Sequence, residues 1–365
     1  MEIENGRIAK RQREGEVDPS AEPPLVRSKI WFKDGNIVLQ AGRTQFKVYQ
    51  GLLAESSAVF ADLFSVPQPP VTEAELVEGC AVVNLADSVV DVTFVLEALF
   101  QRRYATVREP IPIETVAAFV RMGNKYQIND LLKDGVRRLC YEFPDTLADY
   151  DETDDWSTII SRNGVMTDVV NLAREQNILS VLPAALYGYI NSNYITEMDI
   201  HSTHGLSLID ERTLSKASLP LLRLEGETAF SWLTSDSPPG CLTLDECTQA
   251  RNRVIRSSFF PIPNWHGLSS WKDVWEDSMC DVCVAKAQEL HAAGRQQFWD
   301  QFPPLLGLPG WDELRKEKIS LEEGLYVDHY VVRALSDHIM LLPQLKSTAH
   351  APVTTSLMRS MVAST

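Results

Sequence analysis

The spacing of apolar residues changes halfway through the segment "TQFKVYQGLLAESSAVFADLF", residues 44–64. Phe46 and Val48 alternate with polar neighbours, as the residues of a half-buried strand do. From Gly51 onward the apolar residues follow helical spacing.

A strand that turns tightly into a helix is a common place for an active site, but no general-base motif accompanies Ser57 here. We therefore expect the Ser57 hydroxyl to bond the local backbone. The residues expected to form the core under the helix are Phe46, Leu53, Phe60 and Leu63.

Strand patterns flank this segment on both sides. Residues 1–29 are polar and without a sustained period, so they are predicted to be a disordered tail. Residues 29–42 are expected to form a strand or a bent strand pair with its turn at Asp34-Gly35. Residues 81–85 predict a short buried strand, and Asp87-Ser88 then offers an N-cap for a helix.

The pattern becomes helical after residue 112. Residues 113–127 and 128–140 predict two consecutive helices. Residues 144–156 contain six carboxylates and no basic residue, which predicts a solvated linker or surface loop.

An internal similarity follows at an offset of 50 residues. The segments from Val120 and from Val170 each read as a helix, a polar corner, an isoleucine at the corner and a second helix. Ile128 and Ile178 are the two corner isoleucines, and Leu132 aligns with Leu182. This similarity indicates that helical hairpins continue to stack after the first domain.

The rest of the chain divides into three predicted regions. Residues 157–230 are expected to be a region of helical hairpins. Residues 231–345 contain five tryptophans between Trp265 and Trp311, so they are expected to be a helical module with a core of its own. Residues 346–365 are rich in serine and threonine and are expected to be a mobile tail.

Charge and hydropathy limit the classes of partner. The 365-residue chain carries 50 acidic and 34 basic residues, for a net charge of −16. This argues against nucleic acid as the main ligand, because phosphates are bound by clustered Lys and Arg. The sequence has no apolar run long enough for a membrane helix and no secretory signal pattern at its N-terminus, so we expect an intracellular protein without a membrane partner.

Common catalytic motifs are missing from the sequence. It has no phosphate-binding G-x-x-x-x-G-K-S/T, no G-x-G-x-x-G, no H-E-x-x-H and no G-x-S-x-G. A nucleophilic pair could be drawn from Cys280 or Cys283 with His266 or His291, but two cysteines so close together more often share a metal or a redox role. We therefore expect no enzyme.

Four grouped cysteines are the strongest chemical signal. Cys280 and Cys283 form a C-x-x-C element, and Cys241 and Cys247 form an earlier pair. Tetrahedral zinc needs four converging soft ligands, and one C-x-x-C turn supplies two of them. The sequence thus predicts a structural zinc site, with His266 as an alternative to Cys241. The other interpretation is four cysteines that share a Trp-rich core without a metal.

Residues 30–143 resemble the BTB/POZ domain. The matching segments are "NIVL" at 36–39, "FKVYQGLLAESSAVF" at 46–60, "AVVNL" at 81–85 and "MGNKYQINDLLKDGVRRL" at 122–139. The chain is similar to fungal BTB proteins in particular, including the helical segment after the domain. The resemblance implies an α+β fold, in which a short sheet is capped by helical hairpins and followed by a mostly α-helical C-terminal region.

The resemblance also implies that the chain binds proteins and needs no cofactor for this. Many members are substrate adaptors of cullin-type ubiquitin ligases, and others regulate transcription. Asn36, Tyr49 and Gln50 stand where the family has charged residues or histidine that line a peptide-binding groove, so these residues are the candidate partner-binding positions.

The predicted function is therefore a non-enzymatic interaction module, with a cullin adaptor as its specific form and self-association through the domain as a further mode of partner binding. The alternatives are a transcription-regulatory or oligomerisation scaffold, and a thiol- or metal-dependent enzyme carried by the C-terminal half.

Overall fold

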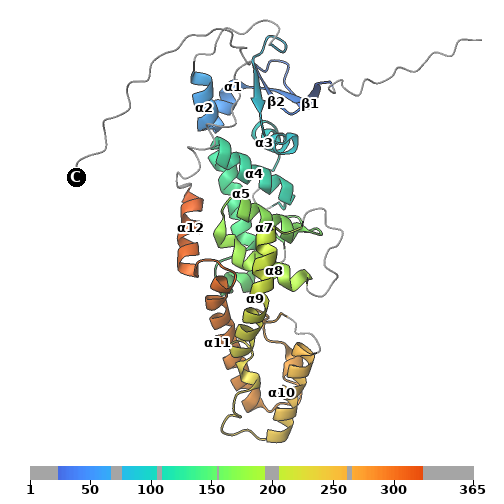
Figure 1. Cartoon of the computed structure of the whole chain (residues 1–365), viewed down its shortest axis with the longest axis vertical. Coiled ribbons are helices and arrows are strands. Elements are labelled where there is room, and N and C mark those ends of the chain that lie inside the picture. Colours follow the sequence, from blue (N-terminus) through green and yellow to red (C-terminus); the bar gives the residue numbers. More distant parts are fainter. Residues whose placement is uncertain are drawn as a thin grey trace, which may run out of the picture.

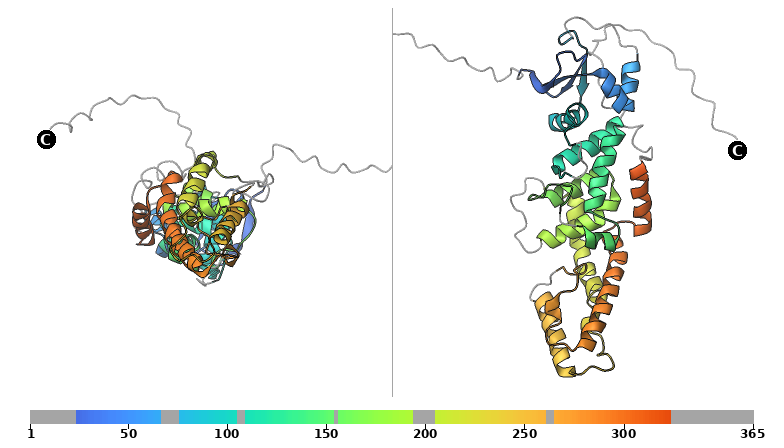
Figure 2. Two further views of the ribbon diagram at one scale, coloured as in Figure 1. Left: turned by 90° about the horizontal axis from the view of Figure 1, so that it is seen from below. Right: turned by 180° about the vertical axis from the view of Figure 1, so that it is seen from behind.

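The protein is an elongated stack of helices with a small β-sheet at one end and α10 at the other (Figures 1 and 2). The computed structural model describes residues 24–66, 76–104, 109–153, 156–193, 205–260 and 265–323. Within this part the fold is mixed α+β, with one four-stranded sheet near the N-terminal end and a mostly helical remainder. None of the helices in these ranges combines the length and apolar character needed to cross a membrane.

The sheet contains strands β1 (Val26–Trp31), β2 (Ile37–Ala41), β3 (Thr44–Val48) and β4 (Val82–Leu85) in the order β1-β3-β2-β4. β2 and β3 form an antiparallel hairpin, while β1 is parallel to β3 and β4 is parallel to β2. The hairpin turn lies at Gly42, whose φ of 52° is easily adopted by glycine. The strands β1 and β2 flank the predicted turn at Asp34-Gly35, where the Gly35 amide donates to the Phe32 carbonyl over 3.1 Å. They do not pair with each other as a hairpin, because β3 lies between them in the sheet.

The strand β1 also corrects the predicted N-terminal tail. Residues 26–29 belong to this strand, and residues 1–23 lie outside the described part of the chain. β1 is an edge strand in which only Ile30 is buried. Its sequence therefore lacks the apolar alternation that would have revealed it.

Strand β3 is buried on both of its faces rather than on one. Gln45 and Lys47 are buried, as are their apolar neighbours Phe46 and Val48. The Gln45 side-chain amide donates to Oε1 of Gln40 over 2.8 Å, and the Lys47 ammonium donates to the Lys33 carbonyl over 3.1 Å and to Glu78 over 3.0 Å. Each buried polar group thus has a partner, as burial requires.

The strand leads into two short helices, α1 (Gln50–Ser56) and α2 (Ala58–Ser65), that meet at Ser57. The Ser57 hydroxyl accepts a hydrogen bond from the Phe60 amide over 3.0 Å and donates one to the Tyr126 carbonyl over 2.5 Å. The expected local backbone bond of Ser57 is confirmed, and a second bond joins α2 to the end of α4. Phe46, Leu53 and Phe60 are buried as predicted, and Leu63 packs at the edge of the same core.

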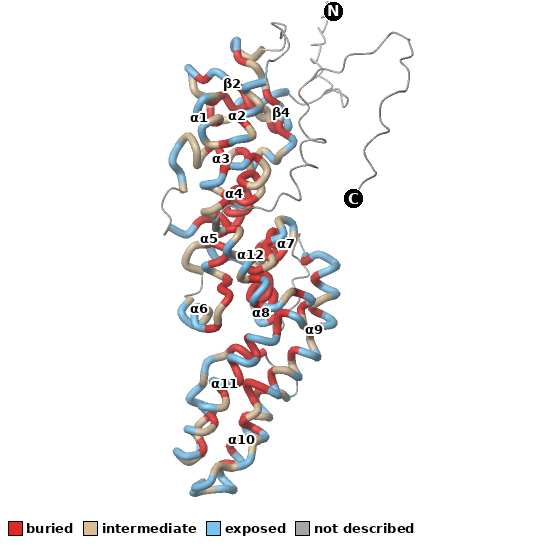
Figure 3. Tube along the Cα trace, turned by 90° about the vertical axis from the view of Figure 1, so that its left-hand side faces the viewer, coloured by how far each residue is buried: buried red, intermediate tan, exposed pale blue. Residues whose placement is uncertain are grey.

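Three longer helices continue the stack below the sheet: α3 (Val89–Gln101), α4 (Ile113–Tyr126) and α5 (Asn129–Glu142). Ser88 is the N-cap of α3, as predicted, and its hydroxyl accepts from the Asp91 amide over 3.0 Å. Figure 3 shows buried residues along the inner sides of α4, α5, α7 (Val165–Glu175) and α8 (Leu182–Asn193).

The predicted internal similarity is present as a repeated corner. At the end of α4, Gln127 has a φ of 52°, and the Ile128 amide donates to the Gly123 carbonyl over 2.9 Å. At the end of α7, Asn177 has a φ of 54°, and the amide of Ile178 donates five residues back over 2.8 Å. Both isoleucines are buried. The hairpins α4–α5 and α7–α8 therefore share one helix-ending geometry; in the second, η2 (Leu179–Val181) precedes α8.

The predicted acidic linker or surface loop is exposed at Asp149, Asp151 and Glu152, but it forms a helix that is packed into the fold. Residues 147–152 form helix α6 (Leu147–Glu152), with Leu147 buried in the core. Asp145 is also buried and pairs with Arg315 and Lys318. The sequence pattern suggested a solvated loop because the basic partners lie about 170 residues further along the chain.

The C-terminal helices are α9 (Leu208–Glu227), α10 (Leu244–Phe259), α11 (Asp281–Leu305) and α12 (Trp311–Glu323), with short turns η3 (Ser231–Leu233) and η4 (Asp273–Trp275). A small second core forms around Phe230, Trp232 and Trp275. Trp299 and Trp311, in contrast, belong to the main core.

The predicted module of residues 231–345 thus has only part of its tryptophans in a core of its own. α11 spans both cores, and α12 lies against α5 and η2. Residues 324–345 and the predicted tail 346–365 lie outside the described residues.

Candidate metal centre

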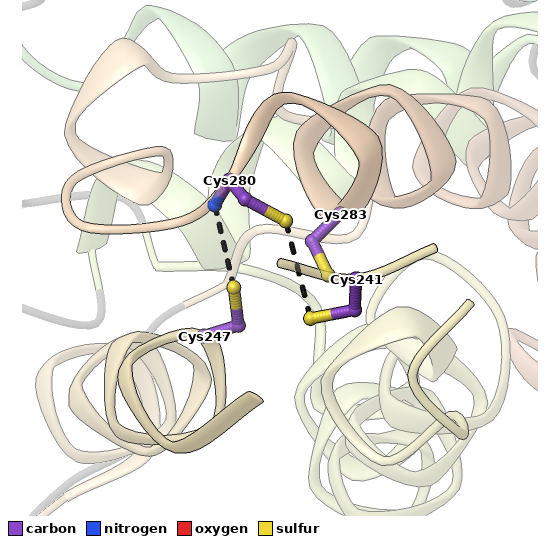
Figure 4. Close-up of side chains that lie close together, drawn as sticks. All are labelled: Cys241, Cys247, Cys280 and Cys283. Atoms are coloured by element: carbon purple, nitrogen blue, oxygen red, sulfur yellow. Dashed lines mark hydrogen bonds between the residues drawn. The ribbon is translucent and has the colours of Figure 1, made fainter. Parts of the chain in front are cut away.

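Four cysteine side chains converge at the end of the molecule opposite the sheet (Figures 1 and 4). Cys241 lies in the loop before α10, and Cys247 lies in the first turns of that helix. Cys280 is the N-cap of α11, and Cys283 is in its first turn. Two helix starts and one loop therefore supply the four thiols.

The sulfur atoms have the spacing of a tetrahedral ligand set. All four Sγ atoms lie within 4.8 Å of one another, and those of Cys241 and Cys280 are 3.9 Å apart. Four sulfurs at about 2.3 Å from a central zinc ion would be about 3.8 Å apart. All four cysteines are free thiols. The cluster is thus able to hold a metal ion with little movement of the side chains.

Backbone groups around the cluster favour negative charge on sulfur. The Cys280 amide donates to the Cys247 Sγ over 3.3 Å. A hydrogen bond from the Leu242 backbone lowers the pKa of Cys280 to about 6. The N-terminal ends of α10 and α11 add their positive dipole ends. These are the features that stabilise thiolates, the form in which cysteine binds metals.

Burial acts in the opposite direction on two other thiols. Desolvation raises the pKa of Cys283 and that of Cys241. A bound cation would compensate for this cost, because it replaces the lost solvation of each thiolate.

The structure brings together the four predicted cysteines and excludes the alternative ligand. His266 is not a member of the cluster, and its Nδ1 lies 3.2 Å from the Ser269 hydroxyl. Burial lowers the pKa of His266 to about 4. His291 is also engaged elsewhere, with its ring nitrogens 2.7 Å from the Ala229 carbonyl and 3.0 Å from the Ser269 carbonyl. Neither histidine is placed to activate Cys280 or Cys283.

The three candidate partner-binding residues lie at the corner between β3 and α1. The Asn36 carboxamide accepts a hydrogen bond from the Gln50 amide over 2.8 Å, so it caps α1 instead of bonding the Gln50 side chain. The Tyr49 hydroxyl donates to Asp34 over 2.6 Å, and its ring packs against Phe32. The side-chain oxygen of Asn36 and the hydroxyl of Tyr49 are therefore occupied within the chain.

A buried glutamate was missed at the sequence level. Glu225 on α9 is fully buried, and its Oε1 accepts from the His266 amide over 3.1 Å. Its second oxygen has no hydrogen-bond partner among the described residues, and burial raises its pKa to about 8. The sequence did contain a signal for the burial of Glu225, because this residue continues the helical spacing of the buried residues Leu214, Ala217 and Leu221.

Comparison of the chain with protein-family models, curated proteins and solved structures found no match.

Proposed function

We propose that this protein is a non-enzymatic interaction protein in which residues 30–143 form a BTB/POZ-like module. We further propose that it is an intracellular substrate adaptor of a cullin-type ubiquitin ligase. In this arrangement the sheet end docks on the ligase scaffold, and the helical half carries the surface for a second partner.

The observation that carries the proposal is the repeated corner of the helical hairpins. The turn from α4 to α5 is reproduced at the end of α7: a left-handed residue, Gln127 or Asn177, is followed by a buried isoleucine in each corner. Both hairpins contribute to one hydrophobic core. Hairpins that continue in this way extend the docking surface of a module without a break, as an adaptor requires.

Ion pairs between the hairpins support a fixed geometry. Arg121 on α4 binds Glu175 on α7 through two nitrogens at 2.7 and 2.9 Å. Arg162 bridges Glu114 on α4 and Asp168 on α7. A rigid connection between two docking surfaces is useful for an adaptor, because it sets the distance between the two proteins that it joins.

We also propose that the four cysteines hold a structural zinc ion. Four thiolates complete the tetrahedral shell, so this set leaves no open position for a substrate or an activated water. The same argument disfavours the alternative of a metal-dependent enzyme in the C-terminal half. The zinc would join the start of α10 to the start of α11, which are 36 residues apart at Cys247 and Cys283.

The adaptor proposal is tested by titrating the full-length protein with a purified cullin scaffold in a calorimeter. We expect a one-to-one complex. The helices of the module expose three large apolar side chains, those of Leu52, Val90 and Tyr141. Each is substituted by serine to map the contact with the cullin scaffold.

At least one of these substitutions should weaken the complex about tenfold, which is the size of a moderate hot spot. Ile319 on α12, which is also exposed, provides the matched control and should leave binding unchanged. If the wild-type protein binds no cullin scaffold, the adaptor form is excluded and an oligomerisation or regulatory scaffold becomes the better interpretation.

A further inference from the structure

Exposed apolar side chains surround the cysteine cluster. Leu242 directly follows Cys241 and is 79% exposed, and Leu244 at the start of α10 is 58% exposed. Val282, inside the C-x-x-C element, is 38% exposed. Single exposed apolar residues are common on protein surfaces, but three around one site indicate a contact surface. We call these three residues the apolar tip.

The cysteine cluster holds the apolar tip in place. The Cys280 amide donates to the Cys247 sulfur over 3.3 Å, and the Cys280 sulfur lies 3.9 Å from that of Cys241, so these contacts link the loop before α10 to the start of α11. The hydroxyl of Thr243, the N-cap of α10, lies 3.4 Å from the Cys247 sulfur. The leucine side chains are therefore displayed on a backbone that is anchored on both sides, which reduces the entropy lost when a partner binds.

Acidic side chains lie in the same first helical turns as Leu244 and Val282 of the apolar tip. Asp245 and Glu246 lie in the first turn of α10, and Asp281 lies in the first turn of α11. All three are exposed, and none forms an ion pair within the described part of the chain. Four thiolates around a divalent cation would add a net negative charge to the same site. Exposed apolar side chains with carboxylates next to them in the sequence are complementary to an apolar segment flanked by cations.

We propose that the apolar tip is the docking site for a partner-protein segment that carries large apolar side chains flanked by lysine or arginine. This inference rests on the proposed function, and it assigns the surface for the second partner to the end of the molecule farthest from the sheet. The apolar side chains of the segment cover Leu242, Leu244 and Val282, and its cations face the carboxylates of Asp245, Glu246 and Asp281.

A second copy of this chain is the competing occupant. Leu208 and Leu219 on α9 are exposed, and Arg212, Lys216 and Arg223 lie on the same side of that helix. This basic and apolar stripe has the same chemistry as the segment proposed to bind the apolar tip. The test therefore includes a variant of the stripe.

The test uses full-length, zinc-loaded protein and two fluorescent helical peptides. Both peptides have the same leucine stripe, and the flanking positions are lysine in one and glutamate in the other. Binding is measured by fluorescence anisotropy at physiological salt, and self-association is measured by sedimentation velocity. We expect the lysine peptide to bind and the glutamate peptide to bind at least about tenfold more weakly, because like charges repel.

Variants assign the site on the protein. Leu242→Ser combined with Leu244→Ser should weaken the lysine peptide about tenfold or more. Asp245→Asn combined with Glu246→Gln should weaken it less and reduce its salt dependence. Leu219→Ser on α9 is the matched control and should leave peptide affinity unchanged. All of these side chains are exposed, and zinc content together with the thermal transition verifies that each variant is folded.

Each of the following outcomes would overturn the inference. One is that neither peptide binds, or that both bind equally. Another is that the leucine variants of the apolar tip bind the lysine peptide as the wild type does. The last is that the protein self-associates and that both the apolar-tip variants and Leu219→Ser abolish this, which would identify a second copy as the occupant. Cullin binding is measured in the same preparations. If the peptide results contradict the inference while the protein still binds the cullin scaffold, the proposed function is unaffected.

Discussion

The Arg295 guanidinium on α11 binds the Asp151 carboxylate on α6 through two hydrogen bonds of 3.1 and 2.5 Å. The two residues are 144 positions apart in the chain. Arg295 also donates to the Leu268 carbonyl over 2.7 Å, so it connects α6, the loop before η4 and α11. The acidic segment of residues 144–156 is thus fixed to the C-terminal half by a charged contact.

Removing the carboxylate should destabilise the protein. We expect Asp151→Asn to lower the free energy of unfolding by about 1–2 kcal/mol, because a mostly buried guanidinium loses its counter-ion while Asp151 itself is partly exposed. Urea unfolding followed by circular dichroism measures the change. Glu289→Gln, which breaks the exposed pair with Lys286, is the control and should cost less than about 0.5 kcal/mol. Equal effects of the two substitutions would contradict the role assigned to Asp151.

Gly294 should not tolerate a side chain. α11 passes so close to the end of α9 that a β-carbon on Gly294 would overlap the Thr228 carbonyl group and lie 2.8 Å from the Ala229 Cα. Both neighbours are backbone atoms, so Gly294→Ala must displace a helix and should cost about 3 kcal/mol or more.

Gly226 provides the opposite expectation. It lies in α9, and a β-carbon at this position would have no neighbour within 4 Å, so Gly226→Ala should stabilise the protein by about 0.5–1 kcal/mol. Thermal unfolding of both variants gives the comparison. A similar melting temperature for Gly294→Ala and the wild type would show that α9 and α11 can move apart at little cost.

The buried carboxyl of Glu225 should make stability depend on pH. Its folded-state pKa of about 8 lies above the ordinary value of 4.5, so the folded protein keeps a proton that the unfolded chain has released. The contribution of Glu225 to the free energy of unfolding is therefore full below about pH 4.5 and is lost as the pH rises to about 8.

Glu225→Gln should remove this loss. The glutamine oxygen can still accept from the His266 amide, whereas no charge has to be buried at high pH. We expect the variant to gain stability over the wild type from about pH 5 to about pH 8 and to keep a constant advantage above it, measured by urea midpoints. Glu227→Gln, at an exposed position two residues later, is the control. If the difference in free energy of unfolding between Glu225→Gln and the wild type does not vary with pH, this would argue against burial of the ionisable carboxyl group.

Zinc removal should loosen the far end of the molecule selectively. We expect one zinc ion per chain by elemental analysis, and we expect a chelator to increase hydrogen exchange in α10 and the first turns of α11 while β2, β3 and α4 stay protected. Cys283→Ser should lose the metal, because three ligands and a hydroxyl hold zinc more weakly than four thiolates.

The control for the zinc experiment is Cys80→Ser. Cys80 lies near the sheet, with its sulfur 3.4 Å from the Gly35 carbonyl, so its substitution should leave the zinc content unchanged. Full zinc occupancy in Cys283→Ser, or metal-free wild-type protein grown in zinc-supplemented medium, would be incompatible with the proposed site.

The two hairpin corners should respond differently to glycine. Gln127 and Asn177 both adopt left-handed φ values, which glycine accepts without strain and asparagine accepts better than glutamine. Gln127→Gly should therefore stabilise by about 0.5–1 kcal/mol, and Asn177→Gly should stabilise by less. Gln176→Gly, at a φ of −99°, should instead destabilise. Chemical unfolding ranks the three variants, and a stabilising effect of Gln176→Gly would refute the assignment.

The sequence by itself determined the features that depend on neighbouring residues. Apolar spacing located α4, α5, α7 and α8, because a helix buries residues three and four positions apart. The N-cap at Ser88 and the corner isoleucines were also readable, since caps and helix ends are made by groups a few residues apart. The C-x-x-C element at Cys280 predicted half of the candidate metal centre for the same reason.

Only the tertiary structure decided which distant groups meet. It placed Cys241 rather than His266 beside Cys280, it buried Lys47 against Glu78, and it joined Asp151 to Arg295. It also placed β3 between β1 and β2, where the sequence had suggested a direct turn. The physical reason is that burial and charge pairing depend on how whole elements pack against one another. The local sequence pattern of a segment does not specify which distant segment will cover it.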